Sequence, residues 1–135
     1  MSIAIVYKTI YGSTGKYAKW LSEAVKSDVF EMDDVKTGLL KNFDNIIVMS
    51  GTYGGKMQWV DFLKNNWEIL KNKKLIAISV GVVPMNHWWS KINYFFVPKF
   101  IKDKIKYFKI YGKTKDSEIE INKNNLDLII KYLKK

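Results

Sequence analysis

Short apolar runs that alternate with helical patterns are the feature that most constrains the fold of this 135-residue chain. Runs of this kind are typical of strands buried on both faces, which occur in parallel sheets covered by helices. Four runs are predicted to be such strands: Ile3–Tyr7, Val29–Met32, Ile46–Met49 and Leu75–Val80. A fifth predicted strand, Tyr107–Tyr111, alternates with lysine and is expected to be half exposed.

Between the predicted strands, apolar residues recur at the spacing of an amphipathic helix. This spacing is found over Tyr17–Val25, Trp59–Leu70 and Leu126–Leu133. It predicts one helix after the first strand, one after the third and one at the end of the chain. Alternating strands and helices are typical of the α/β class. The length suits a single domain, which we expect to span residues 1–135.

The composition excludes several kinds of chemistry. The chain has no cysteine, which rules out a disulfide, a thiolate nucleophile and a cysteine-ligated zinc. It has no arginine, so it lacks the bidentate grip on phosphate that arginine provides. Its single histidine, His87, cannot form a multi-histidine site, and no metal site is expected. Redox or group-transfer chemistry would therefore have to come from a bound cofactor.

Positive charge is concentrated in one segment. The formal net charge is +10, with 23 lysines against 13 acidic residues. Residues 91–115 hold eight of the lysines and only one acid, Asp103. An acidic protein, an anionic membrane surface or a nucleic acid would each complement this segment. The first residues lack the pattern of a signal peptide, and we expect a cytoplasmic protein.

The residues after the first predicted strand, Thr9–Lys16, are rich in hydroxyl groups and glycine. A nucleotide P-loop would need glycine at position 10 and serine or threonine at position 17, where this chain has Ile10 and Tyr17. Gly12 and Gly15 do not have the spacing of the dinucleotide fingerprint. Free amides at a helix N-terminus, together with neighbouring hydroxyls, suit a phosphate monoester. The same hydroxyls are equally suited to capping the helix, and the residues leave both interpretations open.

The first strand and this loop together resemble the signature of the flavodoxin family. The matching residues are Ile5-Val6-Tyr7-x-Thr9-x-x-Gly12-x-Thr14-x-x-x-Ala18-x-x-Leu21. In flavodoxins this loop binds the phosphate of FMN, so the resemblance implies that FMN is the cofactor. It also implies the flavodoxin-like fold, a three-layer, doubly wound α/β sandwich with a five-stranded parallel sheet in the order 2-1-3-4-5. In that fold the ligand lies outside the carboxyl ends of the first and third strands.

Two further loops match the same family. Ser50–Gly55 follows the third predicted strand and is similar to the threonine–aromatic–glycine loop that flavodoxins place against the flavin ring. The resemblance implies Thr52 near the phosphate–ribityl end and Tyr53 against the isoalloxazine. It also implies that a carbonyl of the following glycine pair faces N5, and that a third flavin-contacting loop begins at Gly81. The expected cofactor-binding residues are Thr9, Ile10, Tyr11, Gly12, Ser13, Thr14, Ser50, Gly51, Thr52, Tyr53, Gly54, Gly55, Lys56, Gly81, Val82, Val83 and Trp88.

The resemblance implies an electron carrier. In this family FMN cycles through one-electron steps, and a hydrogen bond from N5–H to the glycine-loop carbonyl stabilises the semiquinone. No side chain is then needed as acid, base or nucleophile, so no catalytic residue is expected. The net charge of +10 departs from the acidic character of familiar flavodoxins. Redox protein partners with an acidic docking face would suit it.

A second hypothesis is an FMN oxidoreductase at the membrane surface. Gly55-Lys56-Met57 and Tyr111-Gly112-Lys113 are similar to flavodoxin-like protoporphyrinogen oxidases, which pass electrons to quinone. The segment Lys91–Lys115 would then contact an anionic membrane, together with the aromatic residues of 82–105. Those aromatic residues, Trp88 among them, are also typical of a buried helix face or of stacking on the flavin.

Two other classes of protein are excluded. A phosphoacceptor receiver domain needs acidic residues after the first and third strands, where this chain has Lys8-Thr9 and Ser50-Gly51. Nucleic-acid binding would depend on the same lysines, but the chain lacks arginine, an RNP-like aromatic motif and helix-turn-helix spacing. We therefore expect no nucleic-acid partner.

Overall fold

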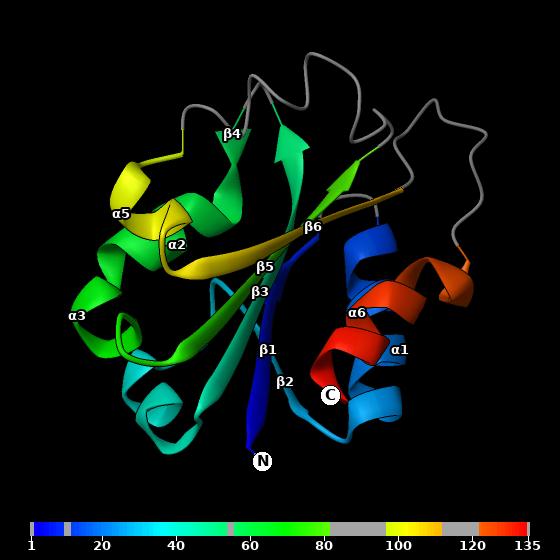
Figure 1. The fold of residues 1–135 in the computed structure, drawn as a ribbon, viewed down its shortest axis with the longest axis horizontal. Helices are drawn as coiled ribbons and strands as arrows, with labels where there is room; N and C mark the ends of the chain where they lie inside the picture. The colour runs from blue at the N-terminus through cyan, green and yellow to red at the C-terminus, as the bar shows by residue number, and fades with distance from the viewer. Residues whose placement is uncertain (1, 10–11, 54–55, 82–96, 112–121, 135) are drawn as a thin grey trace.

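A computed structural model of the chain describes residues 2–9, 12–53, 56–81, 97–111 and 122–134. At its centre is a parallel sheet of five long strands in the order β2-β1-β3-β5-β6 (Figure 1). These strands are β1 Ile3–Lys8, β2 Asp28–Glu31, β3 Asn45–Tyr53, β5 Lys74–Gly81 and β6 Ile105–Tyr111. Counted along the chain, the long strands have the predicted order 2-1-3-4-5. The short strand β4, Lys56–Met57, pairs antiparallel with β3.

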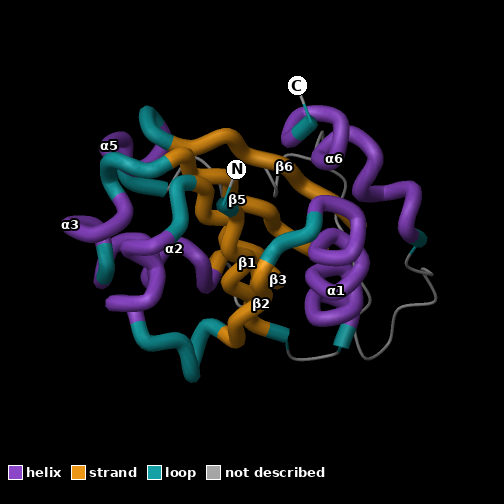
Figure 2. Tube along the Cα trace, turned by 90° about the horizontal axis from the view of Figure 1, so that it is seen from below, coloured by secondary structure: helices purple, strands orange, loops and turns teal. Residues whose placement is uncertain are grey.

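Helices cover both faces of the sheet and give the three predicted layers (Figure 2). One face carries α1 (Ser13–Val25) and α6 (Asp127–Leu133). The other carries α2 (Gln58–Asn65), α3 (Trp67–Leu70) and α5 (Lys99–Lys102). Two short 3₁₀ helices, Thr37–Asn42 and Lys123–Leu126, complete the described elements. No helix among the described residues is long and apolar enough to cross a membrane.

Strand side chains alternate between two buried clusters, one on each face of the sheet. Ile5, Ile47 and Ile78 are fully buried on the face covered by α1 and α6. Their neighbours Val6 and Val48 belong to the cluster beneath α2 and α3. Because both faces are covered, apolar residues occupy successive positions, which explains the continuous runs in the sequence.

The helix predicted over Trp59–Leu70 is in fact two helices. The prediction is wrong at Asn66, which has φ −124° and ψ 21° and separates α2 from α3. The side-chain Nδ2 of Asn66 donates to the Phe62 carbonyl at 2.8 Å, and its backbone N–H donates to the Leu63 carbonyl at 3.3 Å. Asparagine competes in this way with regular helical bonding. The apolar spacing therefore continues across a break in the helix.

The lysines of β6 face both sides of the sheet. Lys106 is exposed, and its ammonium lies 5.6 Å and 5.7 Å from the ring centroids of Phe108 and Tyr132, on the α1/α6 face. Lys109 is three positions further along, so it lies on the opposite face with Tyr107, and it is half-buried. The predicted strand Tyr107–Tyr111 is confirmed and begins two residues earlier, at Ile105. Its lysine, Lys109, is half-buried, whereas the exposed Lys106 precedes the predicted start.

Candidate functional site

The strands β1, β3 and β5 end side by side at one edge of the sheet. Lys8 is in register with Ser50, and Ser50 is in register with Ser79. The loops that follow these strands therefore leave from the same carboxyl edge. In open α/β sheets this edge binds ligands where the strand order reverses, which in this chain is between β1 and β3.

The loop between β1 and α1 is shaped by Thr9 and Gly12. Thr9 Oγ1 accepts a hydrogen bond from the Gly12 N–H at 3.0 Å. Gly12 has φ 90° and ψ −19°, a backbone conformation that side chains with a Cβ rarely adopt. The Gly12 carbonyl then accepts the first hydrogen bond of the helix, from the Lys16 N–H at 3.1 Å. The loop therefore turns sharply into α1.

The residue before α1 is Gly12, which has no side chain to cap the helix. The helix-cap alternative left open by the sequence is wrong for Thr9, whose hydroxyl accepts from the Gly12 N–H before the helix begins. A Cβ at Gly12 would have no atom within 4 Å, so the space beside this glycine is open. Backbone amides at a helix N-terminus attract an anion, and the helix dipole adds to that attraction. The residues present therefore fit a phosphate monoester.

Ser13 and Thr14 begin α1 and are almost fully buried, at 8% and 1% exposure. Gly15 packs closely against the end of β1: a Cβ at this glycine would lie 3.4 Å from Tyr7 Cε2 and 3.5 Å from Thr9 Cγ2. This close packing fixes the first turn of the helix against the strand. The amides of that turn are therefore held in place by the core.

The loop predicted after the third strand is instead a β-hairpin. The prediction ended the strand at Met49, but β3 continues to Tyr53 because Thr52 pairs with Met57 and Tyr53 pairs with Lys56. Backbone pairing of this kind gives the hairpin a defined direction over the carboxyl edge. The sequence pattern missed β4 because two residues are too few for a recognisable period.

Buried polar contacts of Trp59, Ser79 and Met57 connect the base of the hairpin to the core. The Trp59 indole donates from Nε1 to Ser79 Oγ at 3.0 Å, and Ser79 Oγ donates to Met57 Sδ at 2.9 Å. Tyr107 lies beside the indole, with ring centroids 5.9 Å apart. The Ser50 hydroxyl is fully buried and accepts from the Trp59 backbone N–H at 3.1 Å. Ser50, expected at the cofactor, thus points its side chain into the core and holds the start of α2.

Gly81 ends β5 and lies beside a lysine that the sequence analysis did not single out. An ideal Cβ at Gly81 would lie 2.8 Å from Lys109 Nζ and 3.5 Å from Lys109 Cε. Burial lowers the pKa of the Lys109 ammonium below its usual range. The sequence alone could not reveal this contact, because it depends on the register between β5 and β6, in which Ser79 pairs with Lys109.

The ends of β1 and β2 are joined by polar contacts. The Tyr7 hydroxyl donates to Glu31 Oε1 at 3.2 Å, and Lys8 pairs with Asp33 at 3.2 Å. Burial, followed by the negative charge of Glu31, raises the pKa of the Tyr7 hydroxyl above its ordinary value. These contacts hold the strand that leads into the Thr9–Gly12 loop.

Several expected site residues lie outside the described part of the chain. These are Ile10, Tyr11, Gly54, Gly55, Val82, Val83 and Trp88. For Thr52, Tyr53 and Lys56 the backbone is described without the side chains. The remaining expected residues meet at the carboxyl edge, in the β1–α1 loop, at the base of the hairpin and at the end of β5. Their contacts with a cofactor stay a prediction.

Part of the basic segment lies at one corner of the molecule, which we call the α5 corner. It consists of Lys99, Lys102 and Lys104, in α5 and directly after it. Phe100 in the same turn is 49% exposed and packs edge-on against Trp67, with ring centroids 5.1 Å apart. The aromatic residues of 82–105 were predicted to be buried, to stack on the flavin or to face a membrane. Phe100, one of them, is partly packed and partly open to solvent. The others, and Lys91, Lys113 and Lys115, lie outside the described residues.

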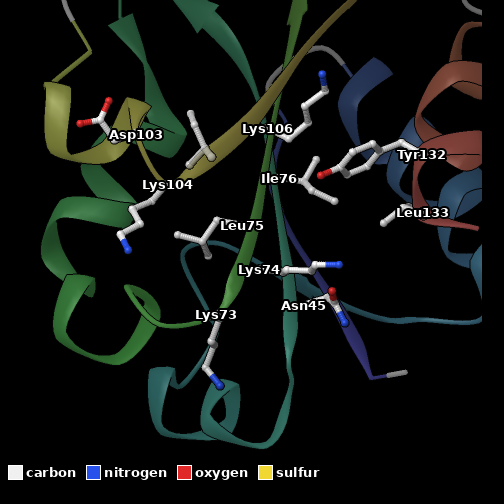
Figure 3. A pocket seen from close by; sticks show the side chains of 11 residues that line it. Asn45, Lys73, Lys74, Leu75, Ile76, Asp103, Lys104, Lys106, Tyr132 and Leu133 are labelled. Atoms are coloured by element: carbon white, nitrogen blue, oxygen red, sulfur yellow. The ribbon is translucent and has the colours of Figure 1, made fainter. Parts of the chain in front are cut away.

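A hollow of about 500 Å³ lies at the opposite edge of the sheet (Figure 3). It is lined at the amino ends of β3, β5 and β6 by residues that include Lys73, Lys104 and Lys106. Figure 3 shows that these lysine side chains point in different directions. Lys73 Nζ already donates to the carbonyls of Lys41 and Phe43, at 3.2 Å and 2.6 Å. The lysines therefore do not converge on a common ligand.

Comparison with solved structures finds the same fold in flavodoxins and a related protein. Flavodoxin 2 from Bacillus cereus is 19% identical, with a TM-score of 0.64, and the match covers 100% of both chains. A flavodoxin from the domain Archaea is also 19% identical, with a TM-score of 0.62 over 97% of this chain and 92% of that one. The Trp repressor binding protein from Bacillus subtilis is 15% identical, with a TM-score of 0.65 over 99% and 98%. At these identities the likeness shows the fold.

Sequence comparison gives the family. An uncharacterised protein of Methanocaldococcus jannaschii is 31% identical over 85 residues, which is 62% of this chain. The chain spans 57% of the length of that curated relative. The sequence model of the flavodoxin domain family matches residues 4–134, which is almost the whole chain. The chain therefore belongs to the flavodoxin family.

Proposed function

We propose that the protein binds FMN at the carboxyl edge of the sheet and carries electrons between redox protein partners. Membership of the flavodoxin family implies flavin binding. The observation that carries the choice of FMN is the N-terminus of α1, where Gly12 has no capping side chain and open space lies beside it. A phosphate-bearing flavin can accept hydrogen bonds from the amides at this helix N-terminus, whereas a flavin without phosphate offers them no anion.

The chain contributes binding and orientation, and the flavin supplies the redox chemistry when bound. The amides of Ser13, Thr14 and Gly15 would hold the phosphate, and Thr9 keeps Gly12 in the required conformation. The hairpin of β3 and β4 would cover the ring, supported by the buried contacts of Trp59. None of these residues has to exchange a proton with the cofactor.

The charge of the chain bears on its partners. With a net charge of +10, the protein associates faster with an acidic docking surface than with a basic one. Within the basic segment, the α5 corner offers the exposed Lys99 and Lys104 together with the half-buried Lys102. An acidic redox protein, or an anionic membrane surface, would dock there.

The phosphate role is tested by removing one hydroxyl at the α1 N-terminus. Thr14→Val is nearly isosteric, and Thr37→Val in the 3₁₀ helix is the matched control. We expect Thr14→Val to weaken FMN binding about tenfold or more, the scale of a hydrogen bond to a charged group, and to leave riboflavin binding unchanged. Titration of the flavin-free protein, followed by flavin fluorescence, measures both constants. Equal losses for FMN and riboflavin would contradict a phosphate at this site.

A further inference from the structure

Lys109 places a positive charge at the carboxyl edge of the sheet. Its ammonium lies over the backbone of Gly81, 2.8 Å from the position that a Cβ would take there. Gly81 has no side chain to occupy this space, so the end of β5 leaves room for the lysine. Since Lys109 lies on β6 at the level of Ser79, its side chain extends toward the carboxyl edge to reach Gly81.

This ammonium has no acidic partner among the described residues. The ion pairs found there join other lysines to Asp33, Glu68 and Asp103. Lys109 is nevertheless half-buried beside Tyr107, so it loses part of its hydration without a compensating protein charge. Lys106, on the same strand, is exposed and lies over two aromatic rings on the other face. Two lysines of one strand thus have different surroundings.

We propose that Lys109 tunes the bound flavin: its charge beside Gly81 favours the reduced, negatively charged form of the cofactor over the oxidised form. This inference rests on the proposed function. Two electrons from the redox partner and one proton from water convert the neutral flavin ring into a singly negative reduced ring. A nearby ammonium stabilises that added negative charge and has little effect on the neutral ring. Lys109 then raises the midpoint potential of the protein-bound cofactor.

The position of the charge, rather than the net charge of the chain, is what matters here. Exposed lysines act on the flavin through water and salt, which screen them over about 10 Å. A half-buried ammonium is screened less, so one residue can outweigh several on the surface. The effect of Lys109 is therefore expected to persist at high salt, whereas the contribution of the surface lysines is expected to decline.

The test compares Lys109→Met with Lys106→Met. Both variants lose one positive charge from β6, so their net charge is the same. The measured quantity is the midpoint potential of bound FMN, obtained by titration with a chemical reductant and an indicator dye. For Lys109→Met we expect the preference for reduced over oxidised flavin to fall about tenfold, which is about 30 mV for a two-electron couple. For Lys106→Met we expect a shift of less than a third of this, and Lys109→Arg should retain most of the potential.

A second variant moves the lysine without removing it. The φ of Gly81 is not in the positive region, so Gly81→Ala introduces no backbone strain, but its Cβ would displace Lys109 Nζ. We expect Gly81→Ala to lower the midpoint potential in the wild-type background and to leave it unchanged in the Lys109→Met background. Equal shifts for Lys109→Met and Lys106→Met, or no shift for either, would overturn the proposal.

A measurement without flavin separates this proposal from the proposed function. In the flavin-free protein, Lys109→Met should raise the urea midpoint of unfolding relative to Lys106→Met, because it removes a half-buried charge that has no acidic partner among the described residues. If the wild-type protein binds no FMN, the proposed function and the tuning role both fall, even with that stability difference present. If it binds FMN and Lys109→Met leaves the potential unchanged, only the tuning role falls.

Discussion

Gly12 gives a sharp test of the loop geometry, because its substitution acts through the backbone alone. Its φ of 90° lies in the region that residues with a Cβ rarely adopt, and nothing lies within 4 Å of the position that a Cβ would take. Gly12→Ala therefore meets strain but no clash. We expect a loss of about 1–2 kcal/mol in the free energy of unfolding. With an m-value of about 2 kcal/mol/M, the urea midpoint falls by about 0.5–1 M.

Gly38 is the matched control for this substitution. It also has open space at the Cβ position, but its φ is not in the positive region. Gly38→Ala should be neutral or stabilising by up to about 1 kcal/mol, because alanine restricts the unfolded chain. Urea unfolding of the two flavin-free variants makes the comparison. A Gly12→Ala protein as stable as Gly38→Ala would refute the conformation assigned to the loop.

Three further predictions concern the support of the site, its pH dependence and its surface. Trp59→Phe removes the donor to Ser79 and should cost about 1–3 kcal/mol in urea unfolding, whereas an unchanged midpoint would contradict a supporting role. Because the pKa of Tyr7 is raised on folding, the unfolded chain releases this proton first, and stability falls as the pH rises above about 10. Tyr7→Phe should reduce that fall, and the same slope as in the wild-type protein would be evidence against the effect. Replacing the three lysines of the α5 corner with glutamine should reduce co-sedimentation of the protein with anionic vesicles. If replacing Lys19, Lys36 and Lys64 reduces it equally, binding depends on net charge and not on the α5 corner.

The sequence predicted the central strands β1, β3 and β5 well because each of them is buried on both faces. Ile46–Ile47-Val48-Met49 is fully buried, and a run of this kind has few alternatives in a chain of this size. The strand order followed from the flavodoxin resemblance and is confirmed. The loop between β1 and α1 was located by the pattern of Thr9, Gly12 and Thr14, because its local geometry depends on residues close together in the chain.

Three features of the structure could not be predicted from the sequence patterns. The hairpin with β4 requires Thr52 and Met57 to pair, and a two-residue strand has no period of its own. The break at Asn66 lies within an apolar spacing that continues on both sides of it. The contact of Lys109 with Gly81 depends on the register between β5 and β6, and 24 positions separate the end of β5 at Gly81 from the start of β6 at Ile105. Without that register, nothing in the sequence distinguishes Lys109 from the other lysines of the chain.

The central claim is that the carboxyl edge of the sheet binds FMN through its phosphate. Titration of the purified, flavin-free wild-type protein with FMN and with riboflavin tests this claim most directly. We expect saturation at one FMN per chain and a clearly weaker affinity for riboflavin, because only FMN carries an anion to which the α1 amides can donate hydrogen bonds. A protein that binds neither flavin, or binds both with the same affinity, would contradict it.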